Sequence, residues 1–283
     1  MATVSAGGAT FDISQVGRGR DLVLFHSLLT DRTVFDPVVP ALADDHRLTL
    51  VNLPGFGGSS APLGPTIEDY ADQVAALFPV LGLDSAETDV LGMSFGGFVA
   101  IALAARHGHL FRRLVLVDTA AAFPEPARVP LRAMAEQAAS EGMAAVVHTA
   151  LRRMFSESFI AGHPEVVAER RRVLLAARPE YFAMACRALA SVDLRAALAA
   201  IHHPTLVVVG ALDTTTPPAL ARELAAGIAG ARLVEIPDCA HCPPIEQPVA
   251  FTRLVRAFLV AGEGRRPPGG PSASTRPSSD RAR

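Results

Sequence analysis

A serine flanked by glycines stands where an apolar run gives way to a helix-like segment. The sequence there is Gly92-Met93-Ser94-Phe95-Gly96-Gly97, so glycines lie two positions before and two positions after Ser94. A sharp strand-to-helix turn holds such a serine in a strained conformation, and residues without side chains let strand and helix approach closely. The pattern predicts that Ser94 is a nucleophile at the end of a strand.

A serine hydroxyl needs a base that removes its proton and an acid that orients the base. Asp213 comes just after the apolar run 205–209 and just before a helix start at Thr216-Pro217-Pro218. His241 lies in the loop after the next apolar run, and a histidine ordinarily titrates near neutral pH, which suits a general base. We therefore predict a triad of Ser94, Asp213 and His241.

Two alternatives concern the acid and the cysteines beside the base. Asp118 also follows an apolar run, and it is a rival to Asp213 as the acid. Cys239 and Cys242 have the C-x-x-C spacing of redox pairs and zinc sites, but no second cysteine pair supplies further zinc ligands. We expect both cysteines to be small, partly buried residues, and we predict no metal site.

The negative charge that develops on an attacked carbonyl oxygen needs backbone N–H donors. We predict that the first is the N–H of Phe95, the residue after the nucleophile. The second is the N–H of Leu28, in the segment His26-Ser27-Leu28-Leu29 that follows an early apolar run. We expect Ser27, Leu28, Met93 and Phe95 to contact the substrate.

The amino-acid composition argues against several other classes of enzyme and of binding partner. All 26 basic residues among the 283 are arginine, so the chain lacks the lysine of Schiff-base enzymes, phosphate loops and kinases. Arginines nearly balance 28 acidic residues, and a net charge of -2 points to no nucleic-acid partner. Three cysteines are too few for a disulfide framework, and no signal peptide or membrane-length apolar segment is visible. We therefore expect a cytoplasmic protein without a membrane partner.

Short apolar runs rich in Val, Leu and Ile alternate with helix-like segments before residue 118 and again after residue 205. This alternation predicts an α/β fold with a mostly parallel sheet and crossover helices. Thr10 to Val16 fits an antiparallel edge strand, because no helix separates it from the next run. The predicted strands are 10–16, 21–26, 47–53, 88–92, 113–117, 205–209 and 232–236, and the predicted helices are 35–43, 67–81, 95–106, 218–228 and 248–260.

The strand signal disappears after residue 118, and Ala, Leu, Met, Arg and Glu dominate the next 80 or so residues. Breaks at Pro130, Gly142, Gly162-His163-Pro164 and Pro179 predict four or five helices there. An arginine of this insertion that faced inward would be able to pair with a substrate carboxylate, although most arginine runs form solvated faces.

These shifts in pattern divide the chain. We expect 1–120 and 193–262 to form the α/β core and 121–192 to form a helical cap inserted into it. We expect 263–283, which is rich in Pro, Gly and Ser and almost free of apolar residues, to be a disordered tail.

The chain resembles the α/β-hydrolase superfamily from residue 10 to about residue 260. The resemblance rests on GMSFGG around Ser94, GALDTTTPP around Asp213 and CAHCPPIEQPVAF around His241. Within the superfamily, HSLLTDRTVFDPVVPAL and SVDLRAALAAIHHPTLVVVGALDTTTPP look similar to 3-oxoadipate enol-lactonases. The resemblance implies an eight-stranded sheet flanked by helices, an inserted helical cap, and the Ser94, Asp213, His241 triad working without a metal or cofactor.

Two features depart from those lactonases. The loop Asn52-Leu53-Pro54-Gly55-Phe56-Gly57 stands where they usually carry Asp-x-Arg-Gly-His-Gly, and it is closer to general esterases and carbon-carbon bond hydrolases. A cap tryptophan is common in the lactonases, and this chain contains no Trp.

We expect the protein to transfer the acyl group of a small-molecule ester or lactone to water. The alternatives are a carbon-carbon bond hydrolase, a cofactor-free haloperoxidase or perhydrolase, and a binding protein that keeps the triad without turnover. Haloalkane dehalogenases and epoxide hydrolases are disfavoured, since they carry Asp where this chain has Ser94. For the oligomeric state, both a monomer and a homodimer fit the sequence.

Overall fold

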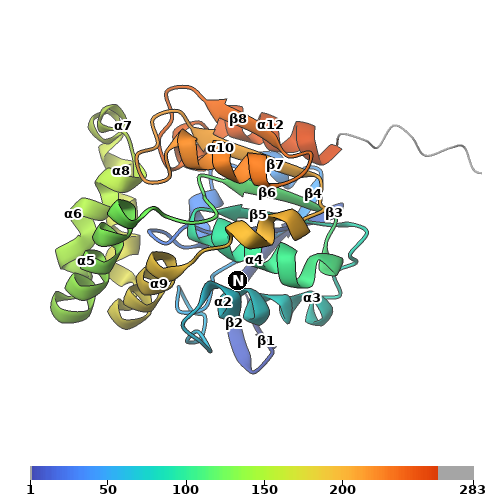
Figure 1. The fold of residues 1–283 in the computed structure, drawn as a ribbon, viewed down its shortest axis with the longest axis horizontal. Helices are drawn as coiled ribbons and strands as arrows, with labels where there is room; N and C mark the ends of the chain where they lie inside the picture. The colour runs from blue at the N-terminus through green and yellow to red at the C-terminus, as the bar shows by residue number, and fades with distance from the viewer. Residues whose placement is uncertain (1, 261–283) are drawn as a thin grey trace, which may run out of the picture.

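The computed structural model describes residues 2–260, which form one eight-stranded sheet with flanking helices (Figure 1). The strands are β1 (Ala2–Ala6), β2 (Ala9–Gly17), β3 (Arg20–Phe25), β4 (His46–Val51), β5 (Thr88–Met93), β6 (Arg113–Val117), β7 (Thr205–Gly210) and β8 (Arg232–Ile236). Their order is β1-β2-β4-β3-β5-β6-β7-β8. β2 pairs antiparallel with both β1 and β4, and all other neighbours are parallel. The predicted mostly parallel, eight-stranded sheet is confirmed.

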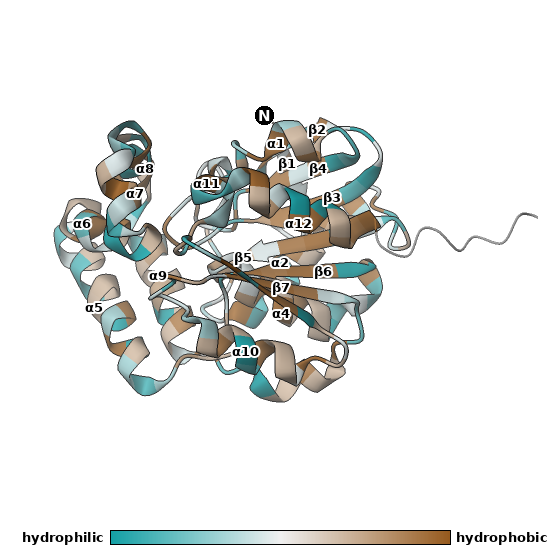
Figure 2. Cartoon of the chain, turned by 90° about the horizontal axis from the view of Figure 1, so that it is seen from above, coloured by the Kyte–Doolittle hydropathy of each residue, from teal (hydrophilic) through white to brown (hydrophobic). Residues whose placement is uncertain are grey.

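Helices cover both faces of this sheet. Those of the core are η1 (Arg32–Phe35), α1 (Val39–Leu42), α2 (Ile67–Ala75), α3 (Leu77–Val80), α4 (Phe95–His107), η2 (Gly108–Leu110), η3 (Arg195–Ala200), α10 (Pro218–Gly227), α11 (Pro243–Glu246) and α12 (Pro248–Val260), where η marks a 3₁₀ helix. Figure 2 shows α1 and α12 on one face and α4 and α10 on the other. Strands covered on both faces bury every side chain, as β5 and β7 do, and this explains their continuous apolar sequences.

Five further helices lie between β6 and β7, at one side of the sheet (Figure 1). They are α5 (Glu125–Glu141), α6 (Met143–Met154), α7 (Glu157–Gly162), α8 (Pro164–Ala176) and α9 (Pro179–Ser191). α5 packs against α6 and α9, and α6 packs against α8. The breaks at Gly142, at His163 and before Pro179 agree with the sequence prediction.

The predicted break at Pro130 is wrong, because α5 continues through this residue. A proline inside a helix removes one hydrogen bond. The buried face of α5 lies after the proline and consists of Leu131, Met134, Ala135 and Ala138. The packing of this face outweighs the loss of one backbone hydrogen bond.

Thr10 to Val16 is an antiparallel strand as predicted, but it is not the edge of the sheet. β1 pairs with it across a turn at Gly7 and Gly8, both of which have positive φ. The sequence of β1 carries little strand signal because most of its side chains are exposed. An edge strand of this kind needs no apolar run.

Two predicted helices are shorter than expected, and proline is the cause in both. The segment 35–43 contains only the end of η1 and the single turn of α1, with Pro37 between them. The segment 67–81 is split into α2 and α3 at Ala76, because Pro79 has no N–H to donate to the carbonyl of Ala75.

No helix within residues 2–260 has both the length and the apolar character that crossing a bilayer requires. The predicted tail, 263–283, lies outside the described residues.

A very close approach of backbone segments joins β5, α4 and the end of β3. A Cβ at Gly92 would lie 2.3 Å from the carbonyl oxygen of Gly96, and one at Gly96 would lie 2.4 Å from that of Phe25. Real Cβ atoms never come so close to a backbone oxygen, so strand and helix can meet here only through glycine.

This approach predicts a large cost for Gly96→Ala, about 3 kcal/mol of the free energy of unfolding, because backbone atoms must move apart. Gly162→Ala is the matched control, since no atom lies within 4 Å of a Cβ built at Gly162. Urea unfolding of the two variants measures the difference. Equal midpoints for both would contradict the packing argument.

Candidate active site

Ser94 occupies the turn between β5 and α4, with φ 51° and ψ -114°. Its N–H donates to the carbonyl of Val117 (2.8 Å), and its own carbonyl accepts bonds from the N–H of Gly97 (2.8 Å) and the hydroxyl of Thr119 (3.0 Å). These bonds hold a backbone conformation that residues other than glycine rarely adopt. The turn presents the Ser94 hydroxyl at the carboxyl end of the central strand.

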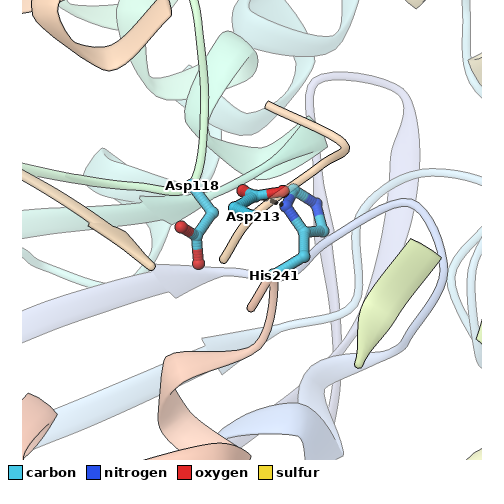
Figure 3. A group of neighbouring side chains, drawn as sticks. All are labelled: Asp118, Asp213 and His241. Atoms are coloured by element: carbon cyan, nitrogen blue, oxygen red, sulfur yellow. Dashed lines mark hydrogen bonds and ion pairs between the residues drawn. The ribbon is translucent and has the colours of Figure 1, made fainter. Parts of the chain in front are cut away.

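His241 connects Ser94 to Asp213. Its Nε2 lies 2.8 Å from Ser94 Oγ, and its Nδ1 lies 2.7 Å from Asp213 Oδ2. All three side chains are buried, and Figure 3 shows the Asp213 carboxylate directed at the imidazole ring. The three residues come from loops after β5, β7 and β8, which end at the same edge of the sheet because these strands are parallel.

The Asp213 carboxylate is fully bonded. Oδ1 accepts from the N–H groups of Thr215 (2.7 Å) and Thr216 (3.0 Å), and Oδ2 accepts from the Thr216 hydroxyl (2.8 Å) as well as from His241. Burial raises the pKa of Asp213, but the charge and hydrogen bond of His241 and the donors of Thr216 outweigh burial and leave the pKa below its usual value. Asp213 is therefore a stable anion that can orient the ring.

The two loops that carry the acid and the base are bonded to each other. The N–H of Leu212 donates to the carbonyl of Cys239 (2.8 Å). Glu246 supports the base loop, since its Oε1 accepts from the N–H groups of Ala240 (3.0 Å) and Cys242 (3.3 Å). Sequence reasoning missed Glu246. The signal was an acid four residues after Cys242, at the end of α11, from where it accepts hydrogen bonds from the N–H groups of the loop before this helix.

Asp118, the rival acid, makes no hydrogen bond with His241 within residues 2–260. Its Oδ1 accepts from the N–H of Gly210 (2.8 Å), while its Oδ2 is buried without a described partner. Burial, followed by the negative charge of Asp213, raises the pKa of Asp118 well above its usual range and favours the neutral acid. The geometry therefore joins Asp213, not Asp118, to the imidazole.

Asp118, Asp213 and His241 each offer one possible metal-ligand atom, and these atoms lie within 4.8 Å of one another (Figure 3). The oxygens of Asp213 already accept hydrogen bonds, and the raised pKa of Asp118 favours a protonated carboxyl group. Metal ligands must be deprotonated and free to bind. This set of donors fits a hydrogen-bonded acid and base better than a metal.

Cys239 and Cys242 are both buried free thiols. Burial raises the pKa of each well above its usual value, and the nearby carboxylates add to the effect. Because the thiolate is the reactive form, such cysteines are poor redox centres and poor metal ligands. Both act as packing residues around the base loop.

Within residues 2–260 no acceptor is described for the N–H groups of Leu28 and Phe95, the two predicted oxyanion donors. Phe95 is the first residue of α4, so its N–H has no acceptor within the helix, and no described residue accepts from Leu28. The N–H of Gly96 donates to the carbonyl of His26 (3.0 Å), which fixes the Leu28 loop beside the Ser94 turn.

A small cavity lies next to Ser94. Its volume is about 10 Å³, which is room for about one water molecule. The lining residues come from both the core and the insertion, and they are Leu28, Leu29, Ser94, Phe123, Leu131, Met134, Arg153, Leu189, Thr215 and His241.

The predicted substrate contacts differ in their relation to this cavity. Leu28 lines it, whereas the side chains of Ser27, Met93 and Phe95 are buried outside its lining. The Ser27 hydroxyl bonds within its own loop, and Phe95 packs against Tyr70. Sequence reasoning missed the lining residues of α5, α6 and α9. The apolar pattern of a helix indicates its buried face, but it does not indicate which residues of that face reach the cavity.

The family model described as "alpha/beta hydrolase fold" matches residues 22–248. The chain belongs to the α/β-hydrolase family. This α/β hydrolase is 30% identical over 239 residues to 3-oxoadipate enol-lactonase 2 of Acinetobacter baylyi, a match that covers 84% of this chain and 88% of the relative. It is 35% identical over 245 residues to a pimeloyl-acyl-carrier-protein methyl ester esterase of Aromatoleum aromaticum, covering 81% and 93%.

A solved structure supports the same assignment. The crystal structure of the enol-lactonase from Burkholderia xenovorans superimposes on this α/β hydrolase with a TM-score of 0.85 at 35% identity. The match covers 92% of this chain and 100% of that one.

His26, which sequence reasoning did not single out, holds the Leu28 loop of this α/β hydrolase. The N–H of Leu53 donates to His26 Nε2 (3.0 Å), so Nδ1 carries the proton and donates to the carbonyl of Ser27 (2.8 Å). The ring is completely buried, and burial lowers the pKa of His26 to about 4. The neutral ring is therefore part of the folded structure.

This burial predicts an acid-sensitive contribution to stability. Between about pH 6.5 and 4 the unfolded chain protonates His26 and the folded chain does not, so stability falls as the pH falls, by up to about 3 kcal/mol. His26→Gln should show a shallower pH dependence of the unfolding free energy than the wild type. His148→Gln, at an exposed histidine, is the control and should follow the wild type. An unchanged slope for His26→Gln would refute the argument.

Proposed function

We propose that the protein is a serine hydrolase that cleaves a carboxylic ester or lactone through an acyl-enzyme. The observation that carries the proposal is the continuous path of hydrogen bonds from Ser94 Oγ through His241 to Asp213, together with two backbone N–H groups, those of Leu28 and Phe95, that have no acceptor among residues 2–260. The relatives named as an enol-lactonase and a methyl ester esterase support ester chemistry.

In the first half of the reaction, Ser94 Oγ attacks the substrate carbonyl while His241 Nε2 takes the hydroxyl proton. Asp213 holds the ring by its bond to Nδ1 and stabilises the imidazolium that forms. The N–H groups of Leu28 and Phe95 donate to the oxyanion of the tetrahedral intermediate, and one such donor contributes about 3 kcal/mol to barrier lowering. His241 then protonates the leaving oxygen.

In the second half, water attacks the acyl-enzyme and His241 removes its proton. The intermediate collapses, Ser94 regains its proton and the carboxylic acid leaves. Every proton in this cycle moves through the imidazole, so we propose that the reaction needs neither a metal nor an organic cofactor.

We propose that residues 121–192 act as a cap on a core formed by 1–120 and 193–262. The cavity beside Ser94 is too small for an ester, and Leu131, Met134, Arg153 and Leu189 of the insertion form part of its wall. A substrate must therefore displace these side chains or the helices that carry them. The exclusion of water from the closed site would strengthen the electrostatic interactions within it.

A serine-directed fluorophosphonate probe tests the proposal directly. We expect the intact protein to be labelled and Ser94→Ala to be unlabelled, and we expect turnover of a series of p-nitrophenyl esters and an enol-lactone to vanish with the same substitution. Absence of labelling and turnover would favour a binding protein on a hydrolase scaffold. Turnover of a dienoic diketone in place of esters would favour a carbon-carbon bond hydrolase.

The roles of the two aspartates predict opposite effects. Asp213→Asn should lower kcat about 10⁴-fold, because the amide favours the wrong tautomer of His241. Asp118→Asn should keep kcat within about threefold of the wild type, since an amide resembles the neutral carboxyl group and can still accept from the N–H of Gly210. Comparable activity in Asp213→Asn and the wild type would transfer the role of the acid to Asp118.

A further inference from the structure

Arg153 is a cation in the wall of the Ser94 cavity whose guanidinium group has no partner among the described residues. It lies in the last turn of α6 and is half-buried. Within residues 2–260 its guanidinium group makes no hydrogen bond or ion pair. Half-burial removes these five N–H donors from bulk water only in part, but no acceptor of the described chain replaces the lost water, so such an arginine calls for an explanation.

The other arginines of the insertion that are not exposed differ from Arg153. Arg170 donates to Thr33 Oγ1 (2.9 Å) and pairs with Glu169, and Arg128 donates to the carbonyl of Phe123 (2.7 Å). Arg178 donates to the carbonyl of Ser59. Partnered arginines are thus the rule in this segment, and Arg153 is the exception that faces the cavity.

The backbone of α6 is fixed at this point by the loops of the acid and the base. The hydroxyl of Thr215 donates to the carbonyl of Arg153 (2.8 Å), and the N–H of His241 donates to the carbonyl of Met154 (3.2 Å). These two bonds set the position of Arg153 relative to Asp213 and His241. The backbone at Arg153 is therefore held beside the loops that carry Asp213 and His241.

Asp213 is a carboxylate whose charge acts on Arg153, but its oxygens already have other partners. Its two oxygens already accept four hydrogen bonds, and no ion pair joins it to Arg153. Burial lowers the pKa of Arg153, while Asp213 opposes the shift, and the group remains a cation. The rest of the cavity wall is apolar apart from Ser94, Thr215 and His241.

We propose that Arg153 binds a carboxylate carried by the substrate, so that the enzyme acts on acidic esters or lactones with a short apolar spacer between the reacting carbonyl and the carboxylate. This inference rests on the proposed function of Ser94. The planar guanidinium group can form two parallel hydrogen bonds with a carboxylate, and it would gain the partner that residues 2–260 do not supply. The apolar wall formed by Leu28, Leu29, Phe123, Leu131, Met134 and Leu189 would contact the spacer.

A single negative charge fits the site better than a phosphate. Arg153 is the one permanently charged residue among those that line the cavity, and His241 must itself become a cation during the reaction. A phosphate dianion would need further donors to offset its desolvation. A bound carboxylate would also neutralise a charge that otherwise opposes protonation of His241.

The kinetic test compares two esters of equal shape. One is the mono-p-nitrophenyl ester of glutaric acid, and the other carries an isopropyl group in place of the free carboxylate. We expect Arg153→Met to lower kcat/KM for the acidic ester about 30-fold and to leave the neutral ester within about threefold of the wild type. Arg153→Lys keeps the positive charge but not the two parallel N–H donors of the guanidinium group, so it should give an intermediate loss of kcat/KM for the acidic ester.

Arg152→Met is the matched control. Arg152 is the neighbouring residue, but its side chain is 56% exposed and pairs with Glu157 at the surface. It should leave both esters unchanged. Equal losses on the acidic and the neutral ester in Arg153→Met would show a structural role and overturn the inference, while ester hydrolysis by Ser94 would still stand.

A binding measurement separates this inference from the proposed function. Monomethyl glutarate is titrated calorimetrically into the Ser94→Ala protein, which needs no turnover. We expect a dissociation constant about 30-fold weaker when Arg153→Met is added, and no change with Arg152→Met. Lack of binding to Ser94→Ala would overturn the carboxylate site. Arg153-dependent binding without turnover of any ester by the wild type would support the site and refute the hydrolase.

Discussion

The site depends on one constraint, which is how closely the backbone of β5, the start of α4 and the end of β3 approach. Only glycine at positions 92 and 96 lets these three segments meet, since a Cβ at either position would lie within 2.4 Å of a backbone oxygen. The approach fixes Ser94 in its strained turn and, through the bond from Gly96 to the carbonyl of His26, brings the Leu28 loop alongside. The proposed nucleophile and the proposed oxyanion donors are therefore positioned by the same contact.

The sequence was sufficient for the parts of the molecule that obey local rules. The run of apolar residues in β5 and the spacing of glycines around Ser94 identify the elbow without any knowledge of distant contacts. Asp213 and His241 could be chosen because each follows a strand at the carboxyl edge of a parallel sheet. The distinction between Asp213 and Asp118 needed the structure, since both follow strands and only coordinates show which one reaches the ring.

The features that escaped prediction depend on tertiary contacts. β1 is mostly exposed, so it has no apolar pattern, and α5 passes through Pro130 because packing on its far side compensates for a lost hydrogen bond. His26, Glu246 and Arg153 are polar residues whose roles come from partners far along the chain, or from the lack of one. Local composition carries no information on such partners, so the roles of these side chains can be recognised only in the folded structure.

The insertion is attached to the loops that carry Asp213 and His241 at the end of α6. Two hydrogen bonds fasten this helix to Thr215 and His241, the residues next to the acid and at the base. To open, the proposed cap must break these two bonds to the loops that hold Asp213 and His241 in position. Substrate entry would therefore break contacts that order the loops of Asp213 and His241. These contacts would form again only when α6 returns to its position against the loops. A substrate too bulky for the proposed cap to close over it would leave the loops of Asp213 and His241 incompletely ordered. The proposed cap would therefore select substrates by size.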